Sequence, residues 1–301
     1  MNKIILITSV GWEPRFQLGL KHTLESNTDI SEIIYLHPTA FRFRTDPILA
    51  ETKLSLQNHS CTQTLIDIDP GDHVSSWRII QNSLSFIQPG YKIILDMTTM
   101  PRQIIWACLH FLEHARVEVQ CIYYRPKAYG KWLSGDNGKP KLLFRHSGIA
   151  YPDRQTCLLL FTGFDVERTT QIVEAFEPAK VILIAPSGNQ LNNTERCVSS
   201  LVSRAKMVNA SLDAYSEITV LRDKLVDLID NDTEQYNVIA TTMGPRSSAV
   251  ALYLLNKSLP EIGLSYASSH LYNEDYSTGI DYSTKFESTV DFSNYRSANK
   301  R

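Results

Sequence analysis

Arginine side chains follow short apolar segments at several points of this 301-residue sequence. The apolar segment 4–7 is followed by Gly11 and Arg15, and the apolar segment 92–95 is followed by Arg102. Each arginine falls where an amphipathic stretch begins, which places it in the first turn of a helix. Guanidinium groups bind phosphate through two parallel hydrogen bonds, and the unsatisfied N–H groups of a helix N-terminus attract anions. These positions therefore predict a site for a phosphate-bearing ligand.

The second half of the sequence repeats this pattern. Gly163 and Arg168 follow the apolar segment 158–161, and the turn 241–247 corresponds to the hydroxyl-rich turn 98–102. A glycine after a strand can adopt positive φ and let a ligand approach the backbone, and hydroxyl groups can donate hydrogen bonds to it. Tyrosines after the last strand of each half could stack on a nucleobase. The candidate ligand-binding residues are Gly11, Arg15, Thr98, Thr99, Arg102, Tyr124, Gly163, Arg168, Thr241, Thr242, Gly244, Arg246, Ser247, Tyr266 and Tyr276.

Each of these features also has a purely structural interpretation. A threonine or serine before a helix commonly caps its N-terminus, and aromatic rings commonly pack a loop against a domain. Arg15 and Arg168 could pair with the nearby carboxylates Glu13 and Asp165 instead of a ligand. Repetition in both halves favours the ligand-binding interpretation, because a single short motif specifies function only weakly. Both interpretations stay open on the sequence alone.

Asp96 is a weak candidate for catalysis. It follows the apolar segment 93–95 and precedes Thr98, where it could act as a general base. Its expected counterpart in the second half is Ala240, and no partner acid or base can be identified. We favour a hydrogen bond that orders the following turn, since a lone carboxylate does not define a catalytic site.

The segment from His110 to His114 matches the His-x-x-Glu-His pattern of zinc-binding helices. Both histidines fall on the flank of their helix away from the apolar stripe, and the second half carries Tyr253 and Lys257 at the corresponding positions. The five cysteines are scattered without a Cys-x-x-Cys pair, which disfavours a cysteine zinc site and a disulfide framework. The glycine-rich dinucleotide fingerprint and the phosphate loop are also missing. We therefore expect no metal and no cofactor.

Six successive elements recur in the same order in both halves, which predicts a tandem duplication of one domain. Within each half, short β-branched strands alternate with amphipathic stretches, as in mainly parallel sheets with helices on both faces. The predicted fold class is α/β, with two tandem Rossmann-like, doubly wound domains. We expect repeat 1 at residues 1–147, repeat 2 at residues 155–285, and a frayed, polar C-terminal tail at residues 286–301.

The charge balance and the apolar runs limit the partners of the protein. Lys and Arg number 30 against 32 Asp and Glu, and a net charge of −2 argues against constitutive, non-specific nucleic-acid binding. No apolar run approaches the ~18 residues that a membrane-spanning helix needs, and the N-terminal run is too short for a secretory signal. We expect a cytoplasmic protein without a membrane partner. The oligomeric state stays open, with a homodimer among the options.

Three segments resemble those of CRISPR-associated Rossmann fold (CARF) sensor domains and of tandem relatives found near bacterial defence genes. They are Gly11-Trp12-Glu13-Pro14-Arg15, Gly163-Phe164-Asp165-Val166-Glu167-Arg168 and Asp275-Tyr276-Ser277-Thr278-Gly279-Ile280. The resemblance covers nearly the whole chain. CARF domains often carry Gly-Thr-Lys or a related turn where this sequence has Met-Pro-Arg and Met-Gly-Pro-Arg, so a cation is kept and the ligand stays open. The resemblance implies a cyclic oligonucleotide or other nucleotide messenger in the cleft between two such domains, with output through a partner protein.

Two functions follow as hypotheses, with a scaffold subunit as a third. The first is a nucleotide-binding sensor or regulatory module in prokaryotic antiviral defence or signalling, which is not itself an enzyme. Its phosphate clamps would be Arg15, Arg102, Arg168 and Arg246. The second is an enzyme, a hydrolase or transferase acting on a nucleotide or phosphosugar. If it cleaved a cyclic messenger, it would be a ring nuclease.

Overall fold

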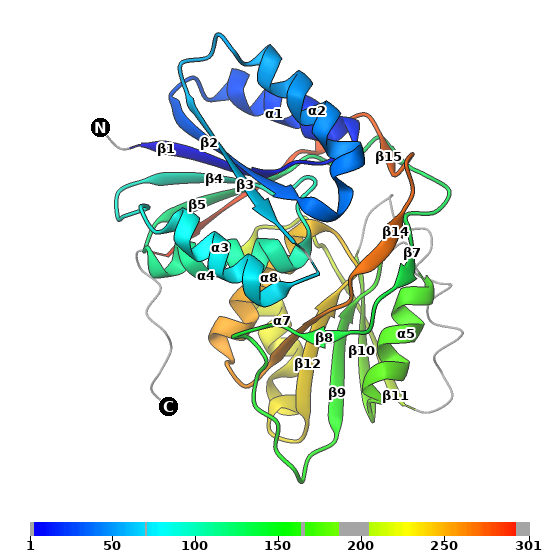
Figure 1. The fold of residues 1–301 in the computed structure, drawn as a ribbon. Helices are drawn as coiled ribbons and strands as arrows, with labels where there is room; N and C mark the ends of the chain where they lie inside the picture. The colour runs from blue at the N-terminus through cyan, green and yellow to red at the C-terminus, as the bar shows by residue number, and fades with distance from the viewer. Residues whose placement is uncertain (1–2, 70, 164–165, 187–204, 293–301) are drawn as a thin grey trace. The chain divides into compact units, whose positions relative to one another are not determined.

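The computed structural model describes residues 3–69, 71–163, 166–186 and 205–292 of the chain (Figure 1). The chain forms two compact units, and each unit takes residues from both halves of the sequence. Of the described residues, unit 1 takes those in the ranges 3–131 and 273–292, and unit 2 takes those in the range 132–272.

A six-stranded sheet in the order β16-β5-β4-β1-β2-β3 forms the centre of unit 1. Its strands are β1 (Ile4–Ser9), β2 (Ile30–Pro38), β3 (Thr62–Ile68), β4 (Lys92–Asp96), β5 (Glu118–Tyr123) and β16 (Phe286–Asp291). Neighbouring strands pair in parallel except for β16, which runs antiparallel to β5. The central strands β1 and β4 are buried along almost their whole length because both faces of the sheet are covered.

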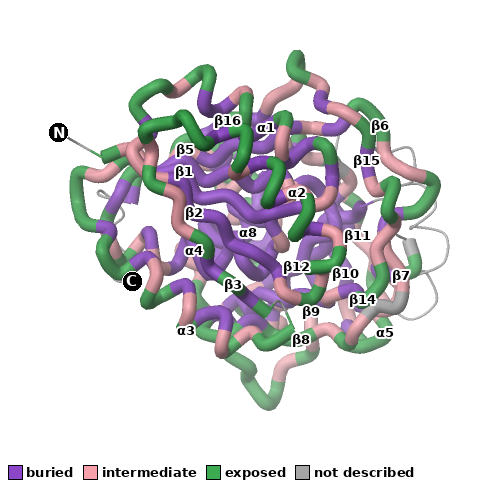
Figure 2. Tube along the Cα trace, turned by 45° about the horizontal axis from the view of Figure 1, so that its top comes forward, coloured by how far each residue is buried: buried purple, intermediate pink, exposed green. Residues whose placement is uncertain are grey.

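Helices cover both faces of this sheet (Figure 1). They are α1 (Pro14–Ser26), the short 3-10 helix η1 (Thr39–Phe41), α2 (Arg42–Ser55), α3 (His73–Leu84) and α4 (Arg102–His114). On one face, Leu20 of α1 and Leu49 of α2 pack with Leu6 and Tyr35 in a single hydrophobic cluster. On the other face, α3 contacts α4 through Trp77. Figure 2 shows that β1 and β2 are largely buried, whereas the edge strand β3 is mostly exposed or half-buried.

Unit 2 repeats this arrangement with a sheet in the order β11-β10-β9-β12-β13-β8. Its strands are β8 (Lys141–Leu142), β9 (Thr156–Phe161), β10 (Lys180–Pro186), β11 (Lys206–Leu212), β12 (Asn237–Thr242) and β13 (Gly263–Tyr266), and its helices are α5 (Val166–Phe176), α7 (Ile218–Thr233) and α8 (Arg246–Ser258). All pairs are parallel except β8 with β13. The repeated winding order confirms the prediction of two Rossmann-like α/β domains. None of the described helices combines the length and apolar character needed to cross a lipid bilayer.

The two halves of the sequence exchange their final strands. β8 belongs to the first half and completes the sheet of unit 2, while β16 belongs to the second half and completes the sheet of unit 1. Two short ladders accompany the exchange: β6 (Ala128–Tyr129) pairs with β15 (Ser277–Thr278), and β7 (Ser134–Asn137) pairs with β14 (Ser269–Tyr272). Ser277 lies opposite Tyr129 in one ladder and Ser134 lies opposite Tyr272 in the other. The same tyrosine–serine pair therefore occurs twice, with the roles of the halves reversed.

This exchange corrects the predicted boundaries. Residues 132–147 belong to unit 2 and not to a domain ending at 147, and residues 273–292 belong to unit 1. The expected frayed tail from Phe286 is wrong for residues 286–291, which form β16. Phe286, Ser288 and Val290 are buried and alternate with exposed residues, and this period of two is the pattern of a half-buried strand. Residues 293–301 of the predicted tail lie outside the described residues.

The strand assignment for β16 predicts a stability effect at Phe286. Phe286→Ala removes a ring that is 4% exposed, and we expect it to lower the free energy of unfolding by about 3 kcal/mol. Thr289→Ala, at an exposed position of the same strand, should change it by less than about 0.5 kcal/mol. Urea unfolding followed by circular dichroism measures both. Equal, negligible effects would mean that the segment is not packed on β5.

Candidate functional site

Two turns pack against each other at the carboxyl edge of the unit 1 sheet, where open α/β sheets bind their ligands. One turn follows β1 and contains Gly11, and the other joins β4 to α4 and contains Thr99. Thr99 Oγ1 donates a hydrogen bond of 2.6 Å to the carbonyl oxygen of Ser9. A Cβ atom on Gly11 would lie 2.6 Å from Thr99 Cβ, which leaves no room for a side chain.

Unit 2 has the same close approach of two turns. A Cβ atom on Gly163 would overlap the carbonyl oxygen of Met243, which lies in the turn between β12 and α8. Neither Gly11 nor Gly163 has a positive φ, so the freedom of glycine to adopt a left-handed backbone is not used at these positions. Glycine is required at both positions because the two turns are in contact, and a Cβ would force them apart.

Asp96 organises the turn that follows β4. Its Oδ1 accepts a hydrogen bond of 2.9 Å from the backbone N–H of Thr98, and Thr8 Oγ1 donates to its Oδ2 at 3.5 Å. Asp96 is 1% exposed, and burial raises the pKa of its carboxyl group, although the hydrogen bonds from Thr98 and Thr8 oppose that shift. Thr98 Oγ1 in turn accepts from the backbone N–H of Tyr124 at 3.0 Å. These contacts agree with the interpretation in which Asp96 orders the turn by hydrogen bonds.

The sheet register corrects the predicted counterpart of Asp96. Asp96 lies opposite Thr8 of β1, and Thr241 lies opposite Leu160 of β9. Thr8 and Leu160 occupy equivalent positions in the two sheets. Two residues after Thr8, the N–H of Val10 donates to the carbonyl oxygen of Leu36 in β2. Two residues after Leu160, the N–H of Thr162 donates in the same way to Ile184 in β10. Thr241, and not Ala240, therefore occupies the position of Asp96. Thr241 is buried, and its Oγ1 has no hydrogen-bond partner among the described residues.

The turn after β12 is ordered by hydroxyl groups instead of a carboxylate. Thr242 Oγ1 accepts a hydrogen bond of 3.0 Å from the N–H of Gly244 and lies 2.6 Å from Ser248 Oγ. Ser247 is buried, and its Oγ donates to the carbonyl oxygen of Ala214. Of the predicted hydroxyl residues of this turn, Thr242 and Ser247 thus make hydrogen bonds within the protein at the start of α8.

Arg15 is buried inside unit 1, where it connects several elements by hydrogen bonds. Its guanidinium is 1% exposed and pairs with the carboxylate of Glu13 at 2.6 Å. It also donates to Ser277 Oγ at 3.0 Å, to the carbonyl oxygen of Tyr124 at 3.0 Å and to Tyr123 Oη at 3.4 Å. Burial alone would lower the pKa of Arg15, but Glu13 and the neighbouring tyrosines raise it overall, so the group stays charged. Its donors are directed at protein acceptors and not at the surface.

Arg168 occupies the equivalent place in unit 2. It is 5% exposed, donates to the carbonyl oxygen of Ala267, and lies over the ring of Tyr266 with its guanidinium carbon 5.9 Å from the ring centroid. Arg15 lies in the same way over Tyr123, at 5.7 Å. Its expected acidic neighbour, Asp165, lies outside the described residues.

Arg102 and Arg246 are placed differently from the first pair. They are the first residues of α4 and α8, and each follows a proline at the N-cap position. The side chain of the proline makes no capping hydrogen bond in either helix. Arg102 is 9% exposed and Arg246 is half-buried. These two arginines therefore lie beside backbone N–H groups that could bind an anion.

The predicted tyrosines do not form a common stacking surface. Tyr124 is fully buried beneath α1, where its Oη lies 2.9 Å from Thr23 Oγ1, and it contacts Gly19 so closely that a Cβ there would lie 2.7 Å from the ring. Tyr266 is 4% exposed beneath Arg168. Tyr276 is half-buried, and its ring packs edge-on against Tyr129 at 6.4 Å. Loop packing, the alternative interpretation, accounts for these positions.

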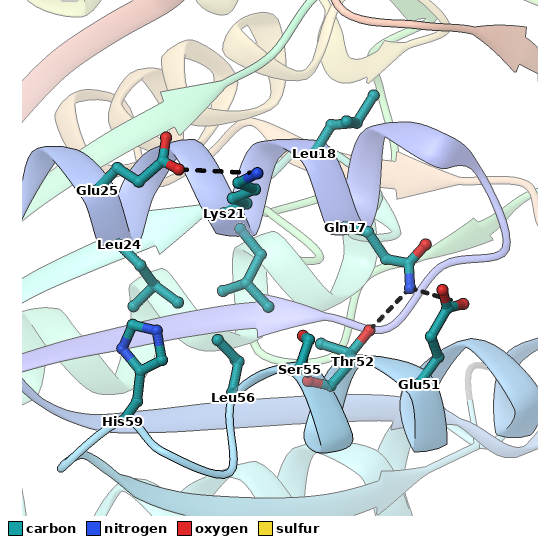
Figure 3. A pocket seen from close by; sticks show the side chains of 11 residues that line it. Gln17, Leu18, Lys21, Leu24, Glu25, Glu51, Thr52, Ser55, Leu56 and His59 are labelled. Atoms are coloured by element: carbon teal, nitrogen blue, oxygen red, sulfur yellow. Dashed lines mark hydrogen bonds and ion pairs between the residues drawn. The ribbon is translucent and has the colours of Figure 1, made fainter.

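A groove between α1 and α2 encloses a cavity of about 470 Å³ (Figure 3). Buried Leu20 and Leu24 of α1 and buried Leu56, directly after α2, form its floor, and polar side chains form its rim. Gln17 donates to Glu51 at 3.1 Å across the groove, and Lys21 pairs with Glu25 along α1 at 3.9 Å. None of the residues predicted from sequence lines this cavity. Its rim groups are largely paired with one another, so it is not the predicted phosphate site.

Sequence reasoning missed an aromatic and cationic cluster at the carboxyl edge of unit 1. Trp12 follows Gly11 in the turn after β1, and its ring lies 5.3 Å from that of Phe41 in η1. Arg44 of α2 lies over Trp12. The available signal was the alternation Phe41-Arg42-Phe43-Arg44 directly after the second strand.

The histidines of the His-x-x-Glu-His segment pack as structural residues. The ring of His110 lies 5.0 Å from Trp77 and 4.4 Å from His114, and His114 Nδ1 lies 2.6 Å from the carbonyl oxygen of His110. Among the described residues, no group of three or more His, Cys, Asp or Glu side chains is arranged to hold a metal ion.

Comparisons with known proteins leave the family open. No family model matches the sequence, and no curated protein matches it. Among solved structures, the chain is similar to the cytoplasmic domain of a prokaryotic cation chloride cotransporter, at 11% identity and a TM-score of 0.29. That match covers 89% of this chain and 96% of the other. A TM-score this low carries no functional argument.

The burial of Arg15 predicts that its removal affects stability first. Arg15→Met leaves the Glu13 carboxylate buried without its cation, so we expect a loss of about 3–5 kcal/mol in the free energy of unfolding. The double variant Glu13→Gln/Arg15→Met should recover part of that loss. Urea unfolding measures both variants. A stable Arg15→Met protein that had lost anion affinity would instead assign Arg15 to the ligand.

The pKa of Asp96 predicts a pH trend. Folding raises the pKa of Asp96 above 3.8, so the folded protein binds this proton more tightly than the unfolded chain does. The proton therefore adds to the free energy of unfolding at low pH, and this contribution is lost as the pH rises above 3.8. Asp96→Asn removes the ionisable group, so its stability relative to wild type should increase from pH 4 to pH 7. Asp96→Ala, which loses the bond to Thr98, should be destabilised by about 1–3 kcal/mol throughout. A pH-independent difference for Asp96→Asn would contradict a buried, desolvated carboxyl.

Proposed function

We propose that this protein is a sensor module that binds an anionic, nucleotide-type small molecule and acts through a partner protein. The observation that carries the proposal is the turn that follows β4 in unit 1 and β12 in unit 2, because each turn opens a helix beginning with arginine. The resemblance to CARF domains favours a cyclic oligonucleotide as the ligand and prokaryotic defence or signalling as the setting.

The geometry of α4 and α8 supports phosphate binding. Proline at each N-cap has no N–H group of its own, and its side chain makes no capping hydrogen bond. The third N–H group of each helix, that of Ile104 or Ser248, donates to the proline carbonyl oxygen. A phosphate placed at the helix start would accept hydrogen bonds from the N–H groups that precede it and from the guanidinium of Arg102 or Arg246. Partial burial strengthens such an interaction, because the local dielectric constant is lower than in water.

The hydrogen bonds behind these turns support a preformed site. Asp96 and Thr242 each hold a backbone N–H of the turn that precedes the helix. A turn fixed before binding loses little conformational entropy when the ligand arrives. Arg15 and Arg168 belong to this support, so the proposed clamps are reduced from four arginines to Arg102 and Arg246.

Ligand binding can be tested by native mass spectrometry with AMP, ATP, cyclic di-AMP and cyclic oligoadenylates at one fixed salt concentration. We expect at least one nucleotide to be bound with unchanged mass. Arg102→Ala and Arg246→Ala should each weaken it about tenfold or more, as expected for the loss of a charge-assisted hydrogen bond. Arg78→Ala, which removes the same charge from an exposed position of α3, should leave the affinity unchanged.

The outcomes separate the possible functions. A bound nucleotide whose mass changes would identify an enzyme, and Asp96→Ala would then be tested for loss of turnover with retained binding. Equal affinities for wild type, Arg102→Ala and Arg246→Ala would remove the proposed clamps. Absence of binding across the whole panel would overturn the sensor proposal and favour a scaffold.

A further inference from the structure

An exposed phenylalanine lies next to an arginine that is stacked on aromatic rings at the carboxyl edge of the unit 1 sheet. Phe43, in the first turn of α2, is 72% exposed. The guanidinium carbon of Arg44 lies 5.2 Å from the centroid of the Phe43 ring and 5.4 Å from that of the Trp12 ring. The guanidinium thus contacts two aromatic rings that come from different turns. We call Trp12, Phe43 and Arg44 the aromatic platform.

Interactions behind the platform hold it in place. His37, at the end of β2, is 2% exposed, and its Nε2 lies 2.8 Å from Thr45 Oγ1. His37 Nδ1 lies 3.2 Å from the carboxylate of Asp67 at the end of β3, and Asp67 also pairs with Arg42. This pairing lowers the pKa of Asp67, which keeps the carboxylate ionised. The first turn of α2 is therefore tied to the sheet on both sides of Phe43.

The platform adjoins one of the turns proposed to bind phosphate. Trp12 is the neighbour of Gly11, and Gly11 packs directly on Thr99 in the turn that leads to Arg102. Both features belong to the carboxyl edge of the same sheet, where strands β1, β2 and β4 end. A ligand with a phosphate at the start of α4 would have its remaining groups on this edge.

We propose that the aromatic platform recognises the base of the nucleotide, with the ring stacked on Phe43 and the negative charge of the ligand near Arg44. The inference rests on the proposed function and names its base-binding subsite. A planar base covers the exposed ring of Phe43 without needing a specific hydrogen-bond pattern. The arginine supplies the cation that a neighbouring phosphate requires.

In the absence of a ligand, Arg44 is paired with Glu274. Its Oε1 accepts a hydrogen bond of 3.2 Å from Arg44 Nη2, and its side chain is 80% exposed. The Arg44 side chain is 17% exposed, and because the Glu274 side chain is itself exposed, a phosphate can take the place of this carboxylate beside the guanidinium. Glu274 lies in the exchanged segment that also carries Ser277 against Arg15. Ligand binding at the platform therefore competes with a contact made by the exchanged segment.

The test compares AMP with ribose 5-phosphate, which has the same sugar phosphate and no base, by isothermal titration calorimetry. Phe43→Ala should weaken AMP binding by about tenfold, as expected for loss of one base stack, and change ribose 5-phosphate binding by less than about twofold. Phe43→Leu, which keeps apolar bulk without a flat ring, should resemble Phe43→Ala. Glu274→Gln should tighten both ligands, because it removes the anion that competes for Arg44.

Matched controls distinguish this inference from the proposed function. Phe86→Ala removes an exposed phenylalanine beyond the end of α3 and should leave AMP binding unchanged. If Arg102→Ala weakens AMP and Phe43→Ala does not, the platform is wrong and the phosphate site stands. If Phe43→Ala weakens both ligands equally, the residue does not read the base, and the inference is overturned. If the wild-type protein binds neither ligand and no other nucleotide, both proposals fail.

Discussion

The fifth parallel strand of each sheet, β5 in unit 1 and β13 in unit 2, has a free edge of backbone N–H and C=O groups that need hydrogen-bond partners. The exchange of strands between the two halves of the sequence follows from how these groups are bonded. In unit 1 the partner is β16, and in unit 2 it is β8. Unpaired edges are costly and prone to join other chains. Each half of the sequence supplies the antiparallel edge strand of the sheet built mainly from the other half. The exchange also brings residues 273–280 to the carboxyl edge of unit 1, where Ser277 contacts Arg15.

The pair Arg15–Glu13 shows how burial separates a structural cation from a ligand-binding one. A buried guanidinium must find acceptors for its donors, and here they are a carboxylate, a carbonyl oxygen and two hydroxyls of the protein. Such a group is already satisfied, and diverting it to a ligand would leave Glu13 as an uncompensated charge. Arg102 and Arg246 differ in their place, because each is the first residue of a helix, where the positive end of the helix dipole attracts anions.

The carboxyl edge of unit 1 therefore has a supporting layer and a set of groups suited to contact a ligand. Asp96, Thr98 and Thr99 hold the turn, and Gly11 allows the neighbouring turn to pack on it. Arg102 and the aromatic platform are proposed to meet the ligand. Unit 2 uses hydroxyls in place of Asp96, because Thr241 occupies that register position and Thr242 orders the turn. The shared architecture thus tolerates different side chains as long as the turn is fixed.

The sequence by itself determined the duplication, the parallel α/β class and the turns that follow the strands. These properties depend on residues close together in the chain, whose periodicity repeats in both halves. The tertiary structure decided which strands complete each sheet, that Phe286 begins a strand, and that Tyr124 is a core residue under α1. It also decided that Gly11 is needed for a contact with Thr99 and that Arg15 bonds Ser277, 262 residues away. Local sequence patterns cannot specify such partners. Whether a side chain supports the fold or is available to a ligand depends on which residues from distant strands pack against it.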